Sequence, residues 1–207
     1  GANYHHTRAG LGGYNPPSAW PQGGAGQRPS GDDRLSVTVE PMTDGPARRM
    51  DFYNYWMNMH SWEAGNPPDG SAYGNTLAHR TDFVAHDGQW HCLEVMARLN
   101  DAPGSAEGGE LAAWIDDELV YHYTEDGPLG YWIRDKFCPA DADNSSCLNY
   151  APPEDEREQE VLNLQWRNSL DLKLNYLWIQ NYISSGDGSV EFDDVVVATT
   201  RIGCMAP

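Results

Sequence analysis

The sequence predicts an all-β fold, a two-sheet antiparallel β-sandwich of the jelly-roll kind. Short segments of alternating apolar and polar residues recur along the 207 residues, turn-forming residues separate them, and no segment has a convincing helical period. Many short strands of this kind are typical of sandwiches and jelly rolls. The expected strands cover residues 34–41, 51–62, 88–100, 109–124, 130–137, 161–168, 172–184 and 189–203.

We expect a single domain over residues 1–207. This length suits one large sandwich and can bury a substantial core. Residues 1–34 are rich in Gly, Pro, Asn and Gln and show no periodicity, so we expect long loops there. Loops of this length are usually functional when they are ordered. Residues 35–204 are expected to supply the strands of the sandwich.

The first two expected strands carry candidate binding residues. Residues 34–41 alternate and end at a proline. In residues 51–62, one face carries Tyr53, Tyr55, Met57 and Met59, and the other carries Asn54, Trp56, Asn58 and His60. The tyrosines could line a groove, or their face could be core. In the second case the opposite face would offer amides for sugar hydroxyls and an indole for a pyranose ring, and the sequence leaves both alternatives open.

The middle of the chain predicts three further elements. Residues 88–100 alternate after a turn. Residues 109–124 contain a strand, a tight turn at Asp116-Asp117 and a returning strand. Residues 130–137 form a shorter element.

Residues 161–184 supply a second row of polar side chains. The row consists of Asn163, Gln165, Arg167, Lys173 and Asn175. Together with Arg28 and Arg34 from the Gly-rich segment, the two cations of this row would give local positive charge inside an acidic protein. The alternative is a set of ordinary solvent-facing side chains.

The last expected strand, residues 189–203, carries two adjacent acids. Phe192 and Val195 are three positions apart, so strict alternation breaks at Asp193-Asp194. A β-bulge there would explain the phase shift. One aspartate is then expected to accept backbone amides from a neighbouring loop while the other faces solvent, with calcium ligation as the alternative.

The charge balance limits the partners of this chain. Its 31 acidic residues against 13 basic ones give a net charge of −18. Nucleic acids need a basic footprint, so we expect no nucleic-acid partner. No segment is apolar for long enough to predict membrane insertion.

Four cysteines predict two disulfides. Cys138 and Cys147 enclose a polar loop, and Cys92 and Cys204 are both expected near strand ends. Disulfides indicate a secreted or cell-surface protein. A zinc site is the alternative, although no pair has C-x-x-C spacing.

Several segments of the sequence together resemble one known family. The segments are "GQWHCLEVMARLN", "GELAAWIDDELVYHY", "LQWRNSLDLKLNYLWIQNYIS" and "VEFDDVVVATTRIG". They are similar to the concanavalin A-like jelly-roll proteins related to polysaccharide lyases of the alginate and glucuronan type, over roughly residues 8–204. The resemblance implies a jelly-roll fold. The N-terminal strands of that fold are not visible before residue 1, so the sequence leaves open whether this chain lacks them.

The resemblance also implies a β-elimination chemistry on acidic glycans. Lyases of this family resemble one another in a Ser-x-Arg strand and a Tyr-x-Tyr strand. Ser36 and Thr38 stand at the first motif here, and Tyr53 and Tyr55 match the second. The family's lysine is missing, and the nearest substitutes are His5, His6 and Arg8.

A uronate lyase needs a carboxylate neutraliser, a base that removes the proton α to the carboxylate, and an acid for the leaving group. The catalytic candidates are Tyr53, Tyr55 and His60, with His5 or His6 as an alternative to His60. The substrate-binding candidates are Arg28, Arg34, Ser36, Thr38, Asn54, Trp56, Asn58, Gln165, Arg167, Lys173 and Asn175.

We therefore expect a secreted protein whose partner is a polysaccharide, with or without lyase activity. A non-catalytic carbohydrate-binding or adhesion module is the first alternative, and a structural surface protein that uses the same sandwich is the second. We expect no required cofactor. A structural calcium ion is compatible with the acidic segments at residues 31–33, 141–144 and 185–188.

Overall fold

The computed structural model describes residues 7–43, 45–61, 70–143, 147, 157–182 and 185–204. The candidates His5 and His6 lie outside these residues. Within the described part, the strands are β1 (Arg8–Tyr14), β2 (Arg34–Pro41), β3 (Ala47–Phe52), β4 (Val84–His86), β5 (Leu93–Arg98), β6 (Glu110–Ile115), β7 (Glu118–Tyr123), β8 (Leu129–Ile133), β9 (Lys136–Pro139), β10 (Glu160–Val161) and β11 (Tyr176–Gln180).

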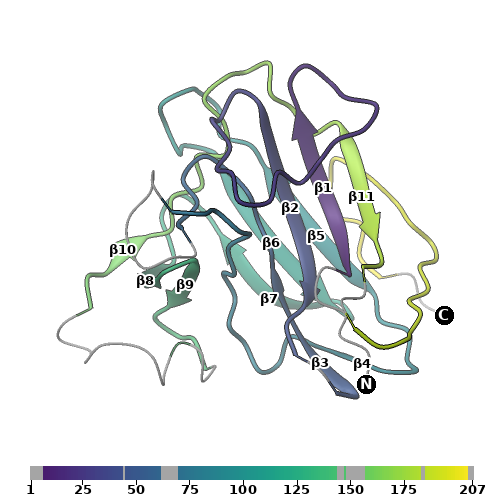
Figure 1. Cartoon of the computed structure of the whole chain (residues 1–207). Helices are drawn as coiled ribbons and strands as arrows, with labels where there is room; N and C mark the ends of the chain where they lie inside the picture. Colours follow the sequence, from purple (N-terminus) through teal and green to yellow (C-terminus); the bar gives the residue numbers. More distant parts are fainter. Residues whose placement is uncertain are drawn as a thin grey trace.

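The strands form two main layers (Figure 1). One layer is an antiparallel five-stranded sheet in the order β11-β1-β2-β3-β4, and the other is the antiparallel sheet β5-β6-β7. A small third sheet, β10-β8-β9, lies to one side of these layers. The predicted all-β sandwich is confirmed.

The alternation of β2 explains how the two layers meet. Leu35, Val37 and Val39 are at most 1% exposed and belong to the main apolar core between the sheets. Successive side chains of a strand point to opposite faces, so Ser36 and Thr38 lie on the outer face of the five-stranded sheet. The core also contains Phe52, Trp56, Phe83, Leu111, Tyr123, Leu164 and Trp166.

The hairpin expected in residues 109–124 is confirmed. β6 and β7 are joined at Asp116-Asp117, whose φ angles are 52° and 69°. Two consecutive residues of positive φ are typical of the hairpin turn that matches the twist of its strands.

The expectation of loops throughout residues 1–34 is wrong for residues 8–14, which form β1 between β11 and β2 in the five-stranded sheet. Its glycines obscured this strand in the sequence. A Cβ on Gly10 would lie 2.1 Å from the carbonyl oxygen of Val37, and one on Gly12 would lie 2.1 Å from the ring of Tyr176. Glycine is therefore required by close packing, which composition alone could not reveal.

Three expected strands are shorter or divided. Residues 51–62 belong to β3 only as far as Phe52, and beyond it single bridges join Tyr55 to Ser36 and Asn54 to Asn75. Residues 130–137 contribute to a hairpin of two strands, β8 and β9. Residues 161–168 contribute only Val161 to β10.

The final strand expected at residues 189–203 is absent from the described structure. Asp194 has a φ of 49°, a left-handed conformation that interrupts a strand. Asp193 accepts the backbone N–H of Asp194 at 2.8 Å, and both acids are exposed. The described residues on both sides of these acids form no strand, so the acids do not form a bulge.

Both predicted disulfides are confirmed. Cys92 bonds to Cys204, which fixes the final segment to the start of β5, and Cys138 bonds to Cys147. Among the described residues, none belongs to a helix that is long and apolar enough to cross a membrane.

Candidate functional site

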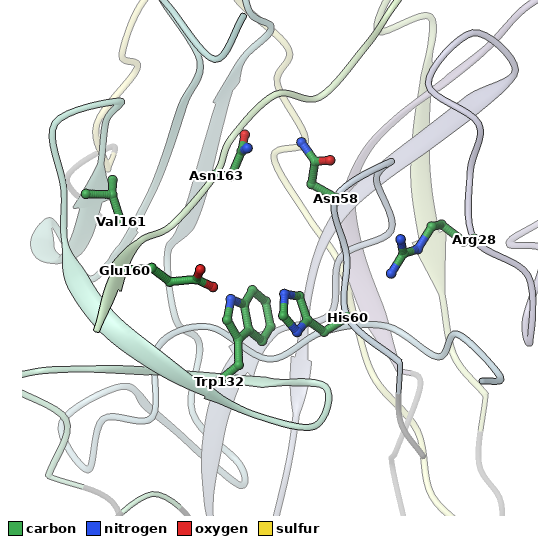
Figure 2. A pocket seen from close by; sticks show the side chains of 7 residues that line it. All are labelled: Arg28, Asn58, His60, Trp132, Glu160, Val161 and Asn163. Atoms are coloured by element: carbon green, nitrogen blue, oxygen red, sulfur yellow. The ribbon is translucent and has the colours of Figure 1, made fainter. Parts of the chain in front are cut away.

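A cavity of about 420 Å³ lies between the small sheet and the segment that follows β3 (Figure 2). This volume is within the usual range of small-ligand sites. Its walls come from segments that are distant in sequence: the loop before β2, the segment after β3, β8, and β10 with the residues after it. The lining residues are Arg28, Asn58, His60, Trp132, Glu160, Val161 and Asn163.

Two amide side chains form one wall of the cavity. Figure 2 shows Asn58 and Asn163 across from the rings of His60 and Trp132. The Nδ2 atom of Asn58 is buried and has no hydrogen-bond partner among the described residues. The side chains of Asn58 and Asn163 both line the cavity, so this wall offers amide groups for hydrogen bonds with a ligand.

His60 and Trp132 form the opposite wall. Their rings are stacked, with centroids 3.8 Å apart and an interplanar angle of 6°. Trp132 in turn packs against Trp56 and Phe137, and the backbone of His60 is fixed by two hydrogen bonds with the side chain of Asn75. The wall is therefore rigid, as a preorganised site requires.

His60 is neutral at neutral pH. Burial, with a smaller contribution from the nearby charge of Arg28, lowers the pKa of its imidazole to about 4. A neutral imidazole can accept a proton from a ligand or hydrogen-bond to a hydroxyl.

Opposite charges stand at the two ends of the cavity. Figure 2 places Arg28 at one end and Glu160 at the other. Arg28 donates to the carbonyl oxygen of Met59, and burial lowers its pKa. Glu160 is exposed. A ligand with a carboxylate at one end and hydroxyls at the other would match this charge pattern.

The depressed pKa of His60 predicts an acid-dependent loss of stability. The ordinary pKa of a histidine is about 6.5, so the imidazole of His60 binds a proton in the unfolded chain as pH falls below that value. In the folded chain the same imidazole binds a proton only near pH 4. This group's stabilising contribution is therefore complete above that window and decreases as pH falls through it. We expect the free energy of unfolding to fall less steeply over this window in His60→Gln than in the wild type, as measured by urea titration. If the free energy of unfolding falls equally steeply with pH in the two proteins, the pKa of His60 is not lowered in the folded state.

The cavity unites only some of the expected site residues. Arg28, Asn58 and His60 line it, whereas Asn54 and Trp56 are fully buried. The expectation of one wet face for residues 54–60 is wrong for these two. Pairing with β2 continues past Phe52, since Tyr55 pairs with Ser36, so regular alternation places Asn54 and Trp56 on the core side with Phe52.

Tyr53 and Tyr55 lie elsewhere, on the outer face of the five-stranded sheet. Their hydroxyls are 3.5 Å apart, and the residues are 6% and 3% exposed. Gly74 lies against the ring of Tyr53, so a loop covers this face. Burial raises the pKa of both phenols, which keeps them protonated. An acid/base role for the pair stays a prediction, and these two residues do not line the cavity.

The same outer face holds Arg34, Ser36 and Thr38, all buried. Arg34 is held by Asp33 at 2.7 Å and by the carbonyl oxygen of Gln27 at 2.7 Å. Thr38 donates to the carbonyl oxygen of Tyr53 at 2.6 Å. Arg34 and Thr38 therefore hold the loop and the strand in place.

The expected polar row of residues 161–184 does not converge on one site. Arg167 donates to the carbonyl oxygens of Asn100 and Leu172, and Asn175 exchanges hydrogen bonds with the backbone of Tyr14. Lys173 is exposed, and Gln165 is partly buried outside the cavity. Of the row, only Asn163 lines the cavity, and sequence reasoning did not select it for binding. Trp132 and Glu160 were also missed, because nothing in their local patterns indicates that β8 and β10 approach the segment after β3.

Two carboxylates of the acidic segment at residues 141–143 make contacts within the protein. Asp141 accepts from Tyr121 at 3.0 Å, and Asp143 accepts from the hydroxyl of Thr81 at 2.7 Å. A structural calcium ion stays a prediction.

No protein-family model, curated protein or solved structure matches this chain.

Proposed function

We propose that this chain is an extracellular polysaccharide-binding protein that holds an acidic sugar unit in the cavity between Arg28 and Glu160. Two disulfides are consistent with an extracellular location. The observation that carries the proposal is the set of polar side chains, from Arg28, Asn58, His60 and Asn163, that lines a cavity of sugar-unit size.

The remaining lining residues favour a glycan over other ligands of that size. A sugar ring presents many hydroxyls and few apolar faces, and the cavity offers two amides, an imidazole and a carboxylate beside the indole of Trp132. Arg28 supplies a cation for a uronate carboxylate inside a chain of net charge −18. Glu160 would repel a carboxylate at the other end, which orients the sugar.

Binding is tested with a panel of polyuronates and neutral glycans by isothermal titration. In Asn58→Ala we expect affinity for the bound polyuronate to fall about 5- to 10-fold, the equivalent of one lost buried hydrogen bond. The exposed Asn168, which does not line the cavity, provides the matched control Asn168→Ala, which should bind like the wild type. Glu160→Gln should bind polyuronate more tightly, because it removes a repelling charge. Equal affinity in Asn58→Ala and the control would refute the site.

His60 supports a second candidate function, β-elimination at the same cavity. In this candidate function the imidazole of His60 removes the proton α to a uronate carboxylate while the guanidinium of Arg28 holds that carboxylate, although a pKa of about 4 makes this imidazole a weak base. The 4-linked oxygen then leaves, a carbon–carbon double bond forms, and the leaving oxygen takes a proton from solvent. The unsaturated product absorbs in the ultraviolet. If the protein binds polyuronate and the absorbance does not rise, the lyase function is excluded and the binding function remains.

A further inference from the structure

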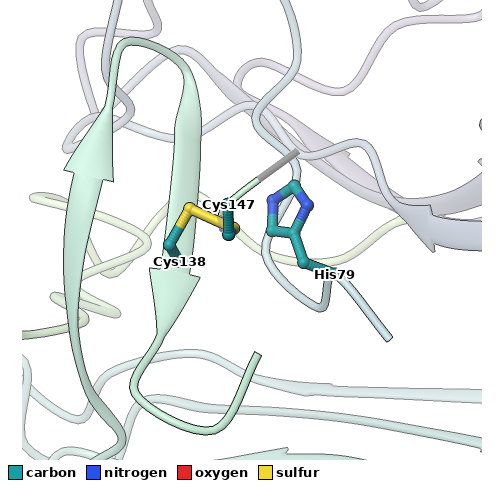
Figure 3. Close-up of side chains that lie close together, drawn as sticks. All are labelled: His79, Cys138 and Cys147. Carbon is teal, nitrogen blue, oxygen red and sulfur yellow. A yellow bond between two sulfur atoms is a disulfide. The ribbon is translucent and has the colours of Figure 1, made fainter. Parts of the chain in front are cut away.

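A second group of chemically reactive side chains lies outside the cavity, beside β9. One ring nitrogen of His79 and the Sγ atoms of Cys138 and Cys147 all lie within 4.8 Å of one another, and all three residues are buried. Figure 3 shows the imidazole facing the bonded pair of cysteines, with a ring nitrogen on the side nearer to Cys147. The sulfurs form the disulfide described above.

We propose that the reduced form of this chain binds a zinc ion between His79, Cys138 and Cys147. In a tetrahedral site, Zn–S bonds of about 2.3 Å and Zn–N bonds of about 2.0 Å place the ligand atoms roughly 3.5–4 Å apart. The three groups already lie within 4.8 Å, so the two sulfurs need only separate from bonding distance. The fourth position is left for water.

Zinc binding at this site requires prior reduction of the Cys138–Cys147 disulfide. A dithiol reductant gives the disulfide two electrons and two protons, and the dithiol becomes a disulfide itself. Zinc then displaces the protons of the two thiols into solvent and binds the thiolates. Zinc binding and disulfide formation therefore compete for the same two sulfurs.

The surroundings of His79 fit a metal ligand. Its Nδ1 atom lies 3.7 Å from Oδ2 of Asp51, and its backbone N–H donates to the same carboxylate oxygen at 2.8 Å. A carboxylate behind the non-ligating nitrogen is the usual support of a metal-bound histidine. The Nε2 atom is 3.1 Å from the hydroxyl of Thr76, a contact that the metal would replace. Burial lowers the pKa of His79, so the ring is in the neutral form that binds metals.

Cobalt(II) tests the proposal, because thiolate-bound tetrahedral cobalt has charge-transfer and visible absorption bands. The wild-type protein is reduced with a dithiol, freed of reductant without oxygen, and titrated with Co²⁺ and then Zn²⁺. We expect one equivalent of tetrahedral cobalt, its displacement by zinc, and no such spectrum in the oxidised protein. In the reduced protein, zinc should also slow the return of the Cys138–Cys147 disulfide.

His79→Asn separates this site from adventitious binding at the thiols. Asparagine tolerates the φ of 50° at this position, so the backbone is preserved while the metal ligand is lost. We expect cobalt affinity to fall at least 10-fold in His79→Asn and to stay unchanged in His122→Asn, which removes an exposed imidazole on β7. Cys92→Ser/Cys204→Ser, which leaves only the proposed thiols, should keep the spectrum if circular dichroism shows that it folds. Absence of tetrahedral cobalt in the reduced wild type, or equal affinity in the two histidine variants, would overturn the proposal.

Discussion

Replacing Asp51 with alanine is expected to lower the free energy of unfolding by roughly 3–5 kcal/mol. The residue is 1% exposed. Its Oδ1 atom accepts the backbone N–H groups of Phe52, Leu77 and Ala78 at 2.7–2.9 Å, and its Oδ2 atom accepts that of His79 at 2.8 Å. Alanine would leave four backbone donors without their acceptor and would release the segment 77–79 from β3.

Chemical denaturation measures this effect, and Asp82→Ala is the control. Asp82 also pairs with a cation, Arg80, at 2.6 Å, but its side chain is 60% exposed. Exposed pairs contribute only about 0–1 kcal/mol, so this variant should unfold close to the wild type. A loss below about 1 kcal/mol in Asp51→Ala would show that the four hydrogen bonds are replaced by water at little cost.

Removing the Cys92–Cys204 disulfide, with serine at both positions, is expected to cost roughly 2–5 kcal/mol. The bond joins residues 112 positions apart, so it restricts the unfolded chain strongly. The segment it holds has few other contacts: Glu94 accepts the N–H groups of Ile202 and Gly203, and Arg201 pairs with Asp117 at 3.1 Å. Most side chains of residues 185–204 are exposed.

Cys92→Ser/Cys204→Ser should therefore have a lower free energy of unfolding than the wild type. Protease should also cleave residues 185–204 faster in this variant. The comparison is the removal of Cys138–Cys147, whose cysteines are 9 positions apart and whose loop-closure contribution is smaller, about 3 kcal/mol or less. An unchanged denaturation midpoint in Cys92→Ser/Cys204→Ser would show that the segment's other contacts suffice.

The fold class was predictable because strand alternation and turn residues are local signals. β2, β5 and the hairpin of β6 and β7 lie where alternation placed them. β1 was missed because its glycines serve a packing need between strands, a contact that only the assembled sheet defines. The last strand was overpredicted from β-branched residues, since strand propensity depends on whether a neighbouring strand is available for pairing.

The candidate site was predictable in part. Asn58 and His60 were selected from one strand face, and Arg28 was selected for its charge within a Gly-rich loop; all three line the cavity. Trp132 and Glu160 come from a separate small sheet, and their approach is set by tertiary packing that has no local signature. The tyrosine pair matched a motif, but the structure places it on a covered sheet face.

A crystal structure with a bound oligouronate tests whether the cavity between Arg28 and Glu160 is the glycan-binding site. We expect one sugar unit between the amides of Asn58 and Asn163 and the ring of His60, with its carboxylate against Arg28 and its hydroxyls toward Glu160. An oligosaccharide that instead lies across Tyr176 and Trp178 on β11, with the cavity holding only water, would contradict it.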